Sequence, residues 1–259
     1  MIKLAGRVFT YLVLAFISVP LILLLLASIN DNSVPYPITG FSFRWFDEAL
    51  SRRDYLVAGL RSLSISVVVT VVAGILAILL AVAVTRGRGR WLKALNFLAI
   101  SPIFVPASVL AFAMLVLAAA IGLIGSVAIL LVAYLVVAFP LMFRALVGAL
   151  QHVNTDVEDA ARVFGLSRTR AFAATTLRAI GRGAVVAAIM AVVAVFNDAV
   201  IGTFLGSVNN QTFAMKLFGY MANEYDSLAA AYGVLMLLVA IPFIILVNRV
   251  MGVQQLKGL

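Results

Sequence analysis

The stretch from Ala94 to Phe143 contains no charged residue, and it is about twice as long as one membrane-spanning helix needs. It therefore has to form two apolar helices. We expect the turn between them at Gly122–Ser126, because the two glycines of this segment permit a tight reversal of the chain. Pro102 and Pro106 fall early in the first of these helices and Pro140 falls late in the second. Each of them is expected to bend its helix.

Four further apolar runs flank this stretch, at residues 8–30, 62–85, 183–204 and 227–248. The composition, with 64% hydrophobic and 11% charged residues and a mean hydropathy of +1.16, excludes a soluble globular domain. The prediction is an all-α polytopic membrane protein with six transmembrane helices. We expect a single transmembrane domain over residues 1–259.

Two polar loops separate these runs, at residues 31–61 and 206–226. The first includes a possible short helix at 42–50, whose Trp45 and Phe46 suit the membrane interface. The chain has no cysteine and one histidine, His152, so disulfides, thiolate chemistry and polyhistidine metal sites are excluded.

Basic residues lie mostly on one side of the predicted topology, which explains the net charge of +9 without invoking nucleic acid. Fourteen of the 19 fall on that side, and the remaining five are offset by acids. The fourteen are Lys3, Arg7, Arg86, Arg88, Arg90, Lys93, Arg144, Arg162, Arg168, Arg170, Arg178, Arg182, Arg249 and Lys257. The positive-inside rule then places both termini and the loop between the fourth and fifth helices in the cytoplasm.

That loop, residues 154–182, is the longest polar interruption of the chain. Thr155 and Glu158 have the spacing of a capping box, in which the threonine hydroxyl and the carboxylate each accept a backbone N–H, so a helix is expected to start there. Its apolar stripe comprises Val157, Ala160, Ala161 and Phe164, and Gly165 permits a bend after it. From the pattern alone, this helix could either lie on the membrane surface or dock into the groove of a partner.

The sequence from Glu158 to Ala161, followed by Gly165 and later Leu177, resembles the EAA loop of permease subunits of binding-protein-dependent ABC importers, the MetI-like family. Asp159 stands where a second glutamate is common, and Arg178 stands where proline often follows the leucine. The resemblance covers about residues 61–255. It implies that the loop is a cytoplasmic coupling helix that docks on an ATPase subunit, with the coupling residues Glu158, Asp159, Ala160, Ala161, Phe164 and Gly165.

The resemblance further implies an importer permease of the cell inner membrane that works by alternating access. The implied partners are a second permease subunit, expected to form a heterodimer with this chain, two ATPase subunits and an external substrate-binding protein, besides the lipid bilayer. The chain lacks a phosphate-binding P-loop, so no cofactor is expected on it, and ATP and Mg²⁺ would bind the ATPase subunits. We do not expect it to be an enzyme.

The run in the third helix from Pro102 to Leu115 and that in the fifth from Phe196 to Leu205 are similar to the spermidine/putrescine-type branch. That branch includes importers of polyamines, opines, aminophosphonates and ferric iron. Asp198 is the only acid within an apolar run, where a charge is costly. Either it lies hydrated or paired near the external end of the fifth helix, or, with Phe196 and Asn197, it faces the substrate pathway.

Two other classes compete with the importer. An ion-coupled secondary transporter or channel subunit would also have about six spans, but carriers of that kind usually bury several ionisable residues, whereas Asp198 is nearly alone here. A membrane-embedded enzyme would need a nucleophile with a base, or a metal cluster. The absence of cysteine and the single histidine disfavour that class.

Overall fold

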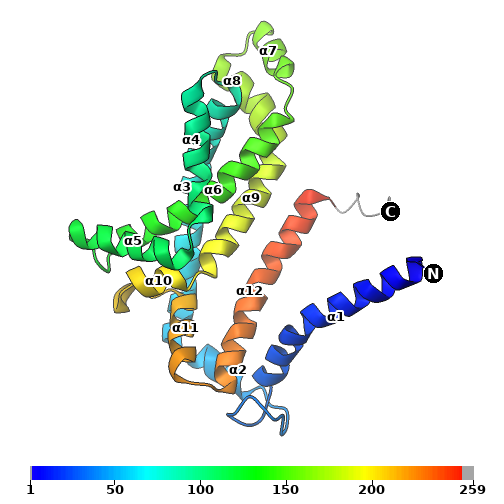
Figure 1. Ribbon diagram of the computed structural model, residues 1–259, viewed down its shortest axis with the longest axis vertical. Coiled ribbons are helices and arrows are strands. Elements are labelled where there is room, and N and C mark those ends of the chain that lie inside the picture. The colour runs from blue at the N-terminus through cyan, green and yellow to red at the C-terminus, as the bar shows by residue number, and fades with distance from the viewer. Residues whose placement is uncertain (1, 253–259) are drawn as a thin grey trace. The chain divides into compact units, whose positions relative to one another are not determined.

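The computed structural model describes residues 2–252, and Lys257 and the end of the expected family core at 255 lie outside the described residues. The described chain is built of α-helices, with one isolated antiparallel bridge between Asn30 and Phe41. The helices are α1 (Ile2–Ser28), α2 (Arg44–Ser51), α3 (Arg53–Arg86), α4 (Arg90–Ile100), α5 (Ala107–Ala120), α6 (Val127–Gln151), α7 (Asp156–Val163), α8 (Arg168–Phe172), α9 (Arg178–Phe196), α10 (Val200–Leu205), α11 (Phe213–Asn223) and α12 (Ser227–Met251) (Figure 1).

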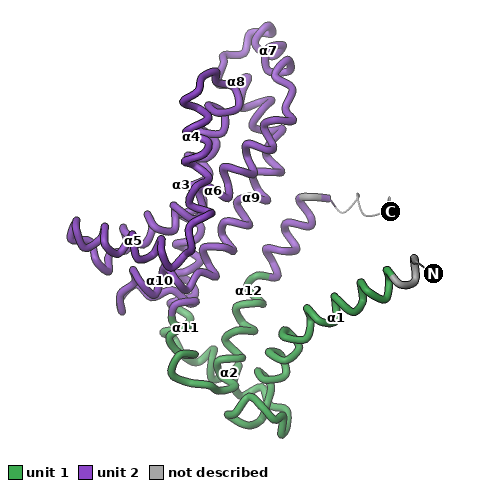
Figure 2. Tube along the Cα trace, in the orientation of Figure 1, with its two compact units in different colours: residues 1–57, 216–240 green, residues 58–215, 241–259 purple. Residues whose placement is uncertain are grey.

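Among the described residues, five helical segments are long and apolar enough to cross a membrane. The segment from Arg90 to Ala120 makes a sixth if its two bent halves count as one span. The prediction of an all-α polytopic membrane protein is therefore confirmed. The chain divides into two compact units, residues 1–57 with 216–240 and residues 58–215 with 241–259 (Figure 2).

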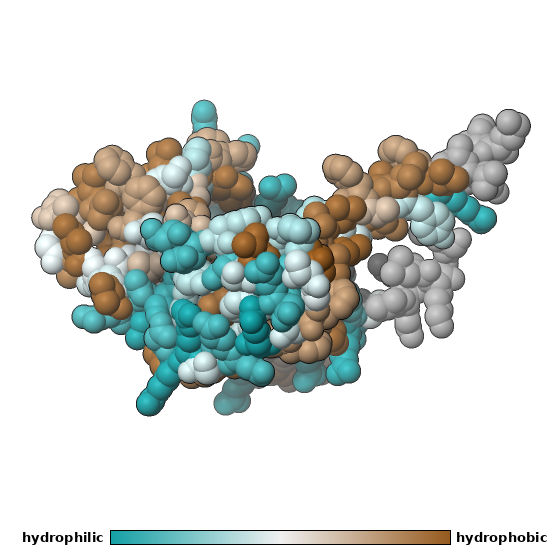
Figure 3. All heavy atoms as spheres, turned by 90° about the horizontal axis from the view of Figure 1, so that it is seen from below, coloured by the Kyte–Doolittle hydropathy of each residue, from teal (hydrophilic) through white to brown (hydrophobic). Residues whose placement is uncertain are grey.

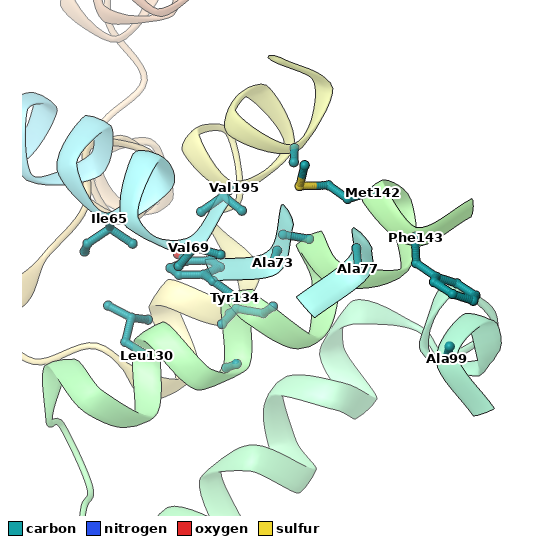
Figure 4. Packing of buried hydrophobic residues seen from close by; sticks show 14 of the residues in the cluster. Ile65, Val69, Ala73, Ala77, Ala99, Leu130, Tyr134, Met142, Phe143 and Val195 are labelled. Carbon is teal, nitrogen blue, oxygen red and sulfur yellow. The ribbon is translucent and has the colours of Figure 1, made fainter. Parts of the chain in front are cut away.

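The larger unit is built around a stripe of small residues on α3. Val69, Ala73, Ala77 and Ala81 recur every fourth residue, so they lie on one face of the helix, and each is at most 2% exposed. They belong to the same buried cluster as Leu130 and Tyr134 of α6 (Figure 4). Small residues let transmembrane helices approach closely, which replaces the hydrophobic driving force that lipid does not supply.

Helices α6 and α9 pack against each other along this unit. A methyl group added at Gly183 on α9 would lie 3.4 Å from the Cβ of Ala149 on α6, an ordinary contact distance. Tyr134 of α6 is fully buried, and its hydroxyl donates to the backbone carbonyl of Asp198 at 3.3 Å. This bond ties α6 to the end of α9.

The break in the long uncharged stretch lies where it was predicted. Gly122 and Gly125 both have positive φ, near +70°, in the turn between α5 and α6. The effect of the earlier prolines was underestimated, because the chain changes direction by 106° between Phe104 and Ala107. Val105, which precedes Pro106, is extended, the conformation that a following proline favours, so the helix stops instead of bending.

Three expectations about the ends of the helices are corrected by the structure. The fifth run does not continue to residue 204, since α9 ends at Phe196 and the short α10 follows. The loop predicted at 206–226 contains α11, and α3 begins at Arg53, well inside the loop predicted at 31–61. Hydropathy alone therefore misplaces helix ends in both directions, because helices continue into polar sequence at α3 and α11, whereas α9 stops inside its apolar run.

The smaller unit contains the predicted short helix, observed as α2. Trp45, which was expected to suit the membrane interface, packs inside this unit. It is 8% exposed, and its Nε1 donates to the carbonyl of Asn30 at 2.7 Å. The surface around α2 and its neighbouring loops is mostly hydrophilic, whereas α1 is mostly hydrophobic (Figure 3).

Candidate functional site

The polar loop forms two short helices, α7 and α8, at the end of the larger unit away from α5 and α10 (Figure 1). Helix α7 begins at Asp156, with Asp156, Glu158 and Asp159 in its first turn, where the helix dipole favours acids. The predicted capping box is wrong. The side chain of Thr155 makes no capping hydrogen bond. The Glu158 N–H donates instead to the backbone carbonyl of Thr155 at 3.0 Å.

The carboxylate of Glu158 turns inward instead of reaching back to Thr155. Its Oε2 lies 2.9 Å from Nη1 of Arg86, the last residue of α3, and accepts from the hydroxyl of Thr176 at 2.6 Å. Arg86 also donates to the Thr176 hydroxyl at 2.8 Å, and its guanidinium lies 5.4 Å from the ring centre of Phe172. These contacts join the end of α3 to two parts of the polar loop, which lies far away in the sequence.

The environment of Glu158 favours its charged form. Burial alone would raise the pKa of this carboxyl, but the hydrogen bonds from Thr176 and Arg86 outweigh burial and hold the pKa below its ordinary value. Glu158 is 7% exposed and Thr176 is fully buried. A charge so enclosed is stable only while its partners remain in place.

Thr176 reaches Glu158 from an irregular turn of helix. Residues Ala173–Leu177 form a π-helical turn between α8 and α9, a feature that is often found at functional sites. The helical segment then runs without a break from Arg168 to Phe196. Arg178, at the position where the resembling family often has proline, is the first residue of α9 and continues the helix.

Gly165 ends α7 as expected, with φ of +90°. Its N–H donates to the Arg162 carbonyl at 3.0 Å, and the Leu166 N–H donates to the Ala161 carbonyl at 3.2 Å. These two bonds are those of a Schellman motif, which requires a left-handed residue at this position. The requirement on Gly165 thus comes from the backbone, since a Cβ added there would meet nothing within 4 Å.

The outer face of α7 is exposed and carries apolar side chains beside charged ones. Val163 and Phe164 are each 85% exposed, and Val157 is 56% exposed. Asp159 and Arg162 form an exposed ion pair at 3.3 Å beside them. Of the predicted coupling residues, the structure gathers Asp159, Ala160, Phe164 and Gly165 on the surface, leaves Ala161 half-buried and turns Glu158 inward.

The second predicted group, Phe196, Asn197 and Asp198, marks the break between α9 and α10. Phe196 is buried, Asn197 is exposed and Asp198 is half-buried. Oδ1 of Asp198 accepts from the N–H of Ile201 at 2.8 Å, so this carboxylate caps the start of α10. The three residues are neighbours, but they do not share one exposed face.

Residues 71–253 match the family described as binding-protein-dependent transport system inner membrane component. The chain belongs to this family. It is a permease component of an ABC importer and an integral membrane protein, and such a membrane subunit is not itself a catalytic enzyme. The predicted family is therefore confirmed.

Curated relatives of this permease include the spermidine/putrescine transport system permease protein PotC of Haemophilus influenzae. It is 21% identical over 92% of this chain and 93% of the relative. The putrescine transport system permease protein PotI of Escherichia coli K12 is 26% identical over 78% of this chain and 75% of the relative. Both agree with the predicted spermidine/putrescine-type branch.

Solved structures share the fold of this permease at low sequence identity. A chain of a bacterial alginate ABC transporter, solved with an alginate pentasaccharide-bound periplasmic protein, has a TM-score of 0.70 at 17% identity, covering 95% of this chain and 92% of that chain. A chain of the inward-facing MetNI methionine ABC transporter has a TM-score of 0.56 at 18% identity, covering 75% of this chain and 95% of that chain.

Sequence reasoning missed Arg86 and Thr176 as parts of the site. Arg86 was assigned only to the basic cluster that indicates orientation, and Thr176, although it lies within the polar loop directly before Leu177, was given no role. A buried acid in an otherwise exposed helix needs a basic partner, but the sequence does not show which of the many arginines supplies it. Only the fold brings the end of α3 to α7.

Proposed function

We propose that the permease carries a small cationic solute of the polyamine class from the exterior to the cytoplasm, powered by ATP hydrolysis on separate subunits. Support comes from the two polyamine permeases among its relatives, together with the half-buried Asp198, which can attract a cation. Asp198 and the exposed Asn197 would give passing cargo a weak contact. Phe196, which is buried, would support that segment from behind.

The coupling element in this proposal is the exposed face of α7. Val163 and Phe164 form an apolar surface that a cleft in an ATPase subunit could cover, as in helix-in-groove recognition. Glu158 would hold the helix in place from the inner side through Arg86 and Thr176. Asp159, Ala160, Ala161 and Gly165 would shape the contact.

The assembly would contain this chain as one transmembrane domain over residues 1–259, a second and different permease subunit, two ATPase subunits that bind ATP and Mg²⁺, and an external substrate-binding protein. The distribution of basic residues supports a cytoplasmic position for both termini and for α7. Closure of the ATPase pair would move α7, and through Arg86 also α3, and so switch access from one side of the inner membrane to the other.

The test is uptake by proteoliposomes that contain the assembled transporter. Radiolabelled putrescine and spermidine should accumulate only with ATP inside and the substrate-binding protein outside, whereas an aminophosphonate and an alginate oligosaccharide should not. Uptake of an anionic solute in place of the polyamines would refute the substrate class. Accumulation driven by an ion gradient without ATP would refute the ATP-driven mechanism.

A further inference from the structure

A cavity of about 610 Å³ lies between the end of α3, the start of α4, and α8. It has an apolar part and a basic part. Ile78, Leu79 and Val82 of α3 line the apolar part. Arg88, in the turn after α3, and Arg168, the first residue of α8, line the basic part.

The positive charge of this cavity is not balanced by the chain. Glu158 is the one acid among the lining residues, and it already pairs with Arg86. Within the described part of the chain, neither Arg88 nor Arg168 forms an ion pair. Two unmatched guanidinium groups that line one cavity form a site suited to a phosphate group.

The predicted topology, in which the basic cluster after α3 lies at the cytoplasmic surface, puts this cavity at the depth of a lipid headgroup. Helix α3 is a candidate span that ends at Arg86. With a rise of about 1.5 Å per residue, Leu79 lies about 10 Å further into the bilayer than Arg86. Leu79 is 64% exposed and Trp91, at the other edge of the cavity, is 62% exposed. Exposed tryptophans are typical of membrane interfaces.

We propose that this cavity binds one anionic phospholipid, with its phosphate between Arg88 and Arg168 and an acyl chain along Ile78, Leu79 and Val82. A soluble phosphate would leave the apolar part empty. A zwitterionic lipid would place the positive charge of its own headgroup near the arginines. The bound lipid links the α3–α4 turn to α8, next to the Arg86–Glu158 ion pair. The site requires only that the end of α3 lie at the bilayer surface, whatever solute the transporter carries.

Native mass spectrometry of the full-length chain in mild detergent tests this site. Phosphatidylglycerol should bind at low stoichiometry and in preference to phosphatidylcholine of the same chain length. Each arginine near an anionic lipid contributes roughly fivefold in affinity, so Arg88→Ala with Arg168→Ala should weaken phosphatidylglycerol binding by about 25-fold.

The matched control is Arg90→Ala with Arg170→Ala. It removes the same charge from α4 and α8, but neither residue lines the described cavity. This pair should retain phosphatidylglycerol binding within about threefold. Equal losses of phosphatidylglycerol affinity in both double variants would show that general surface charge, and not this cavity, binds the lipid, and would overturn the site. Equal binding of phosphatidylcholine, or displacement of the lipid by millimolar inorganic phosphate, would overturn it as well.

A second measurement leaves both arginines in place. The chain has two tryptophans, and Trp45 is buried while Trp91 borders the cavity. Phosphatidylglycerol with brominated acyl chains should quench Trp91 at low lipid-to-protein ratios, and unlabelled phosphatidylglycerol should reverse the quenching while phosphatidylcholine does not. The quenching should disappear in Trp91→Phe. Quenching that phosphatidylcholine reverses equally well would contradict a headgroup site.

Discussion

The ion pair between Arg86 and Glu158, at 2.9 Å, joins the last residue of α3 to the first turn of α7. The two residues are far apart in the sequence, and Thr176 bridges them through hydrogen bonds to both side chains. The inner face of α7 is therefore fastened by polar contacts while its apolar face points outward. A force applied to α7 is therefore transmitted to α3 through the Arg86–Glu158 ion pair, and to α9 through Thr176 in the turn before it.

Replacing Glu158 by alanine should lower the unfolding midpoint of the purified chain, because Arg86 and Thr176 lose their buried partner. In the assembled transporter it should also weaken the coupling of ATP hydrolysis to transport. The expected loss is about 1–3 kcal/mol, toward the lower end because Arg86 is partly exposed. Asp159→Asn is the matched control on the same helix. Its ion pair with Arg162 is exposed, so the loss should stay below about 0.5 kcal/mol. Equal midpoints for the two variants would show that the buried pair does not stabilise α7.

The contribution of Glu158 to the free energy of unfolding should decrease only when the pH is lowered. Burial tends to raise its pKa, but the Thr176 and Arg86 hydrogen bonds lower the pKa below the unfolded value of about 4.3. The contribution is therefore complete above that value and is lost as the pH falls through the folded-state pKa. The midpoint difference between wild type and Glu158→Gln should be constant from about pH 8 to pH 5 and shrink in more acidic solution. A difference that shrinks on going from pH 5 to pH 8 would contradict this assignment.

The sequence predicted those features that depend on composition and local backbone preference. The apolar runs indicated the spans, Gly122 and Gly125 indicated the turn after α5, and Gly165 indicated the end of α7. It could not predict features that depend on tertiary contacts. The capping box failed because Glu158 has stronger partners in Arg86 and Thr176, which only the folded chain brings close.

The end of the fifth run was mispredicted for a related reason. Asp198 lies within the apolar run at 183–204, which suggested one continuous helix, whereas its side chain accepts a backbone N–H in the first turn of a new helix, α10. Short polar side chains often compete in this way for backbone groups. Hydropathy does not distinguish a polar residue inside a helix from one that ends it.

The stability cost of a substitution at Gly165 should follow the backbone strain of the new residue at positive φ. With φ at +90°, alanine should cost about 1 kcal/mol, asparagine less and valine more, because β-branched residues tolerate the left-handed region least. The same alanine substitution at Gly181, inside α9 and with open space at its Cβ, should be neutral or slightly stabilising. The unfolding midpoints of the four variants test this order. Equal costs for asparagine and valine would contradict the assignment of Gly165 to the left-handed position of a Schellman turn.

Asp198→Asn separates the two roles of this carboxylate. Asparagine keeps an oxygen that can accept from the Ile201 N–H, so the unfolding midpoint should change little. Asp198→Ala removes the cap and should cost about 1 kcal/mol. If the charge attracts a cationic solute, polyamine uptake should fall in both variants at equal expression. Wild-type uptake in Asp198→Asn would leave this residue with the capping role alone.

Photocross-linking in the assembled transporter tests most directly whether α7 contacts the ATPase. Phe164 and Val208 are each 85% exposed, but Phe164 follows α7 whereas Val208 lies in the loop after α10. Each is replaced in turn by p-benzoylphenylalanine. We expect a cross-linked product of permease and ATPase subunit from position 164 and none from position 208. No ATPase product from position 164, or equal products from both positions, would contradict it.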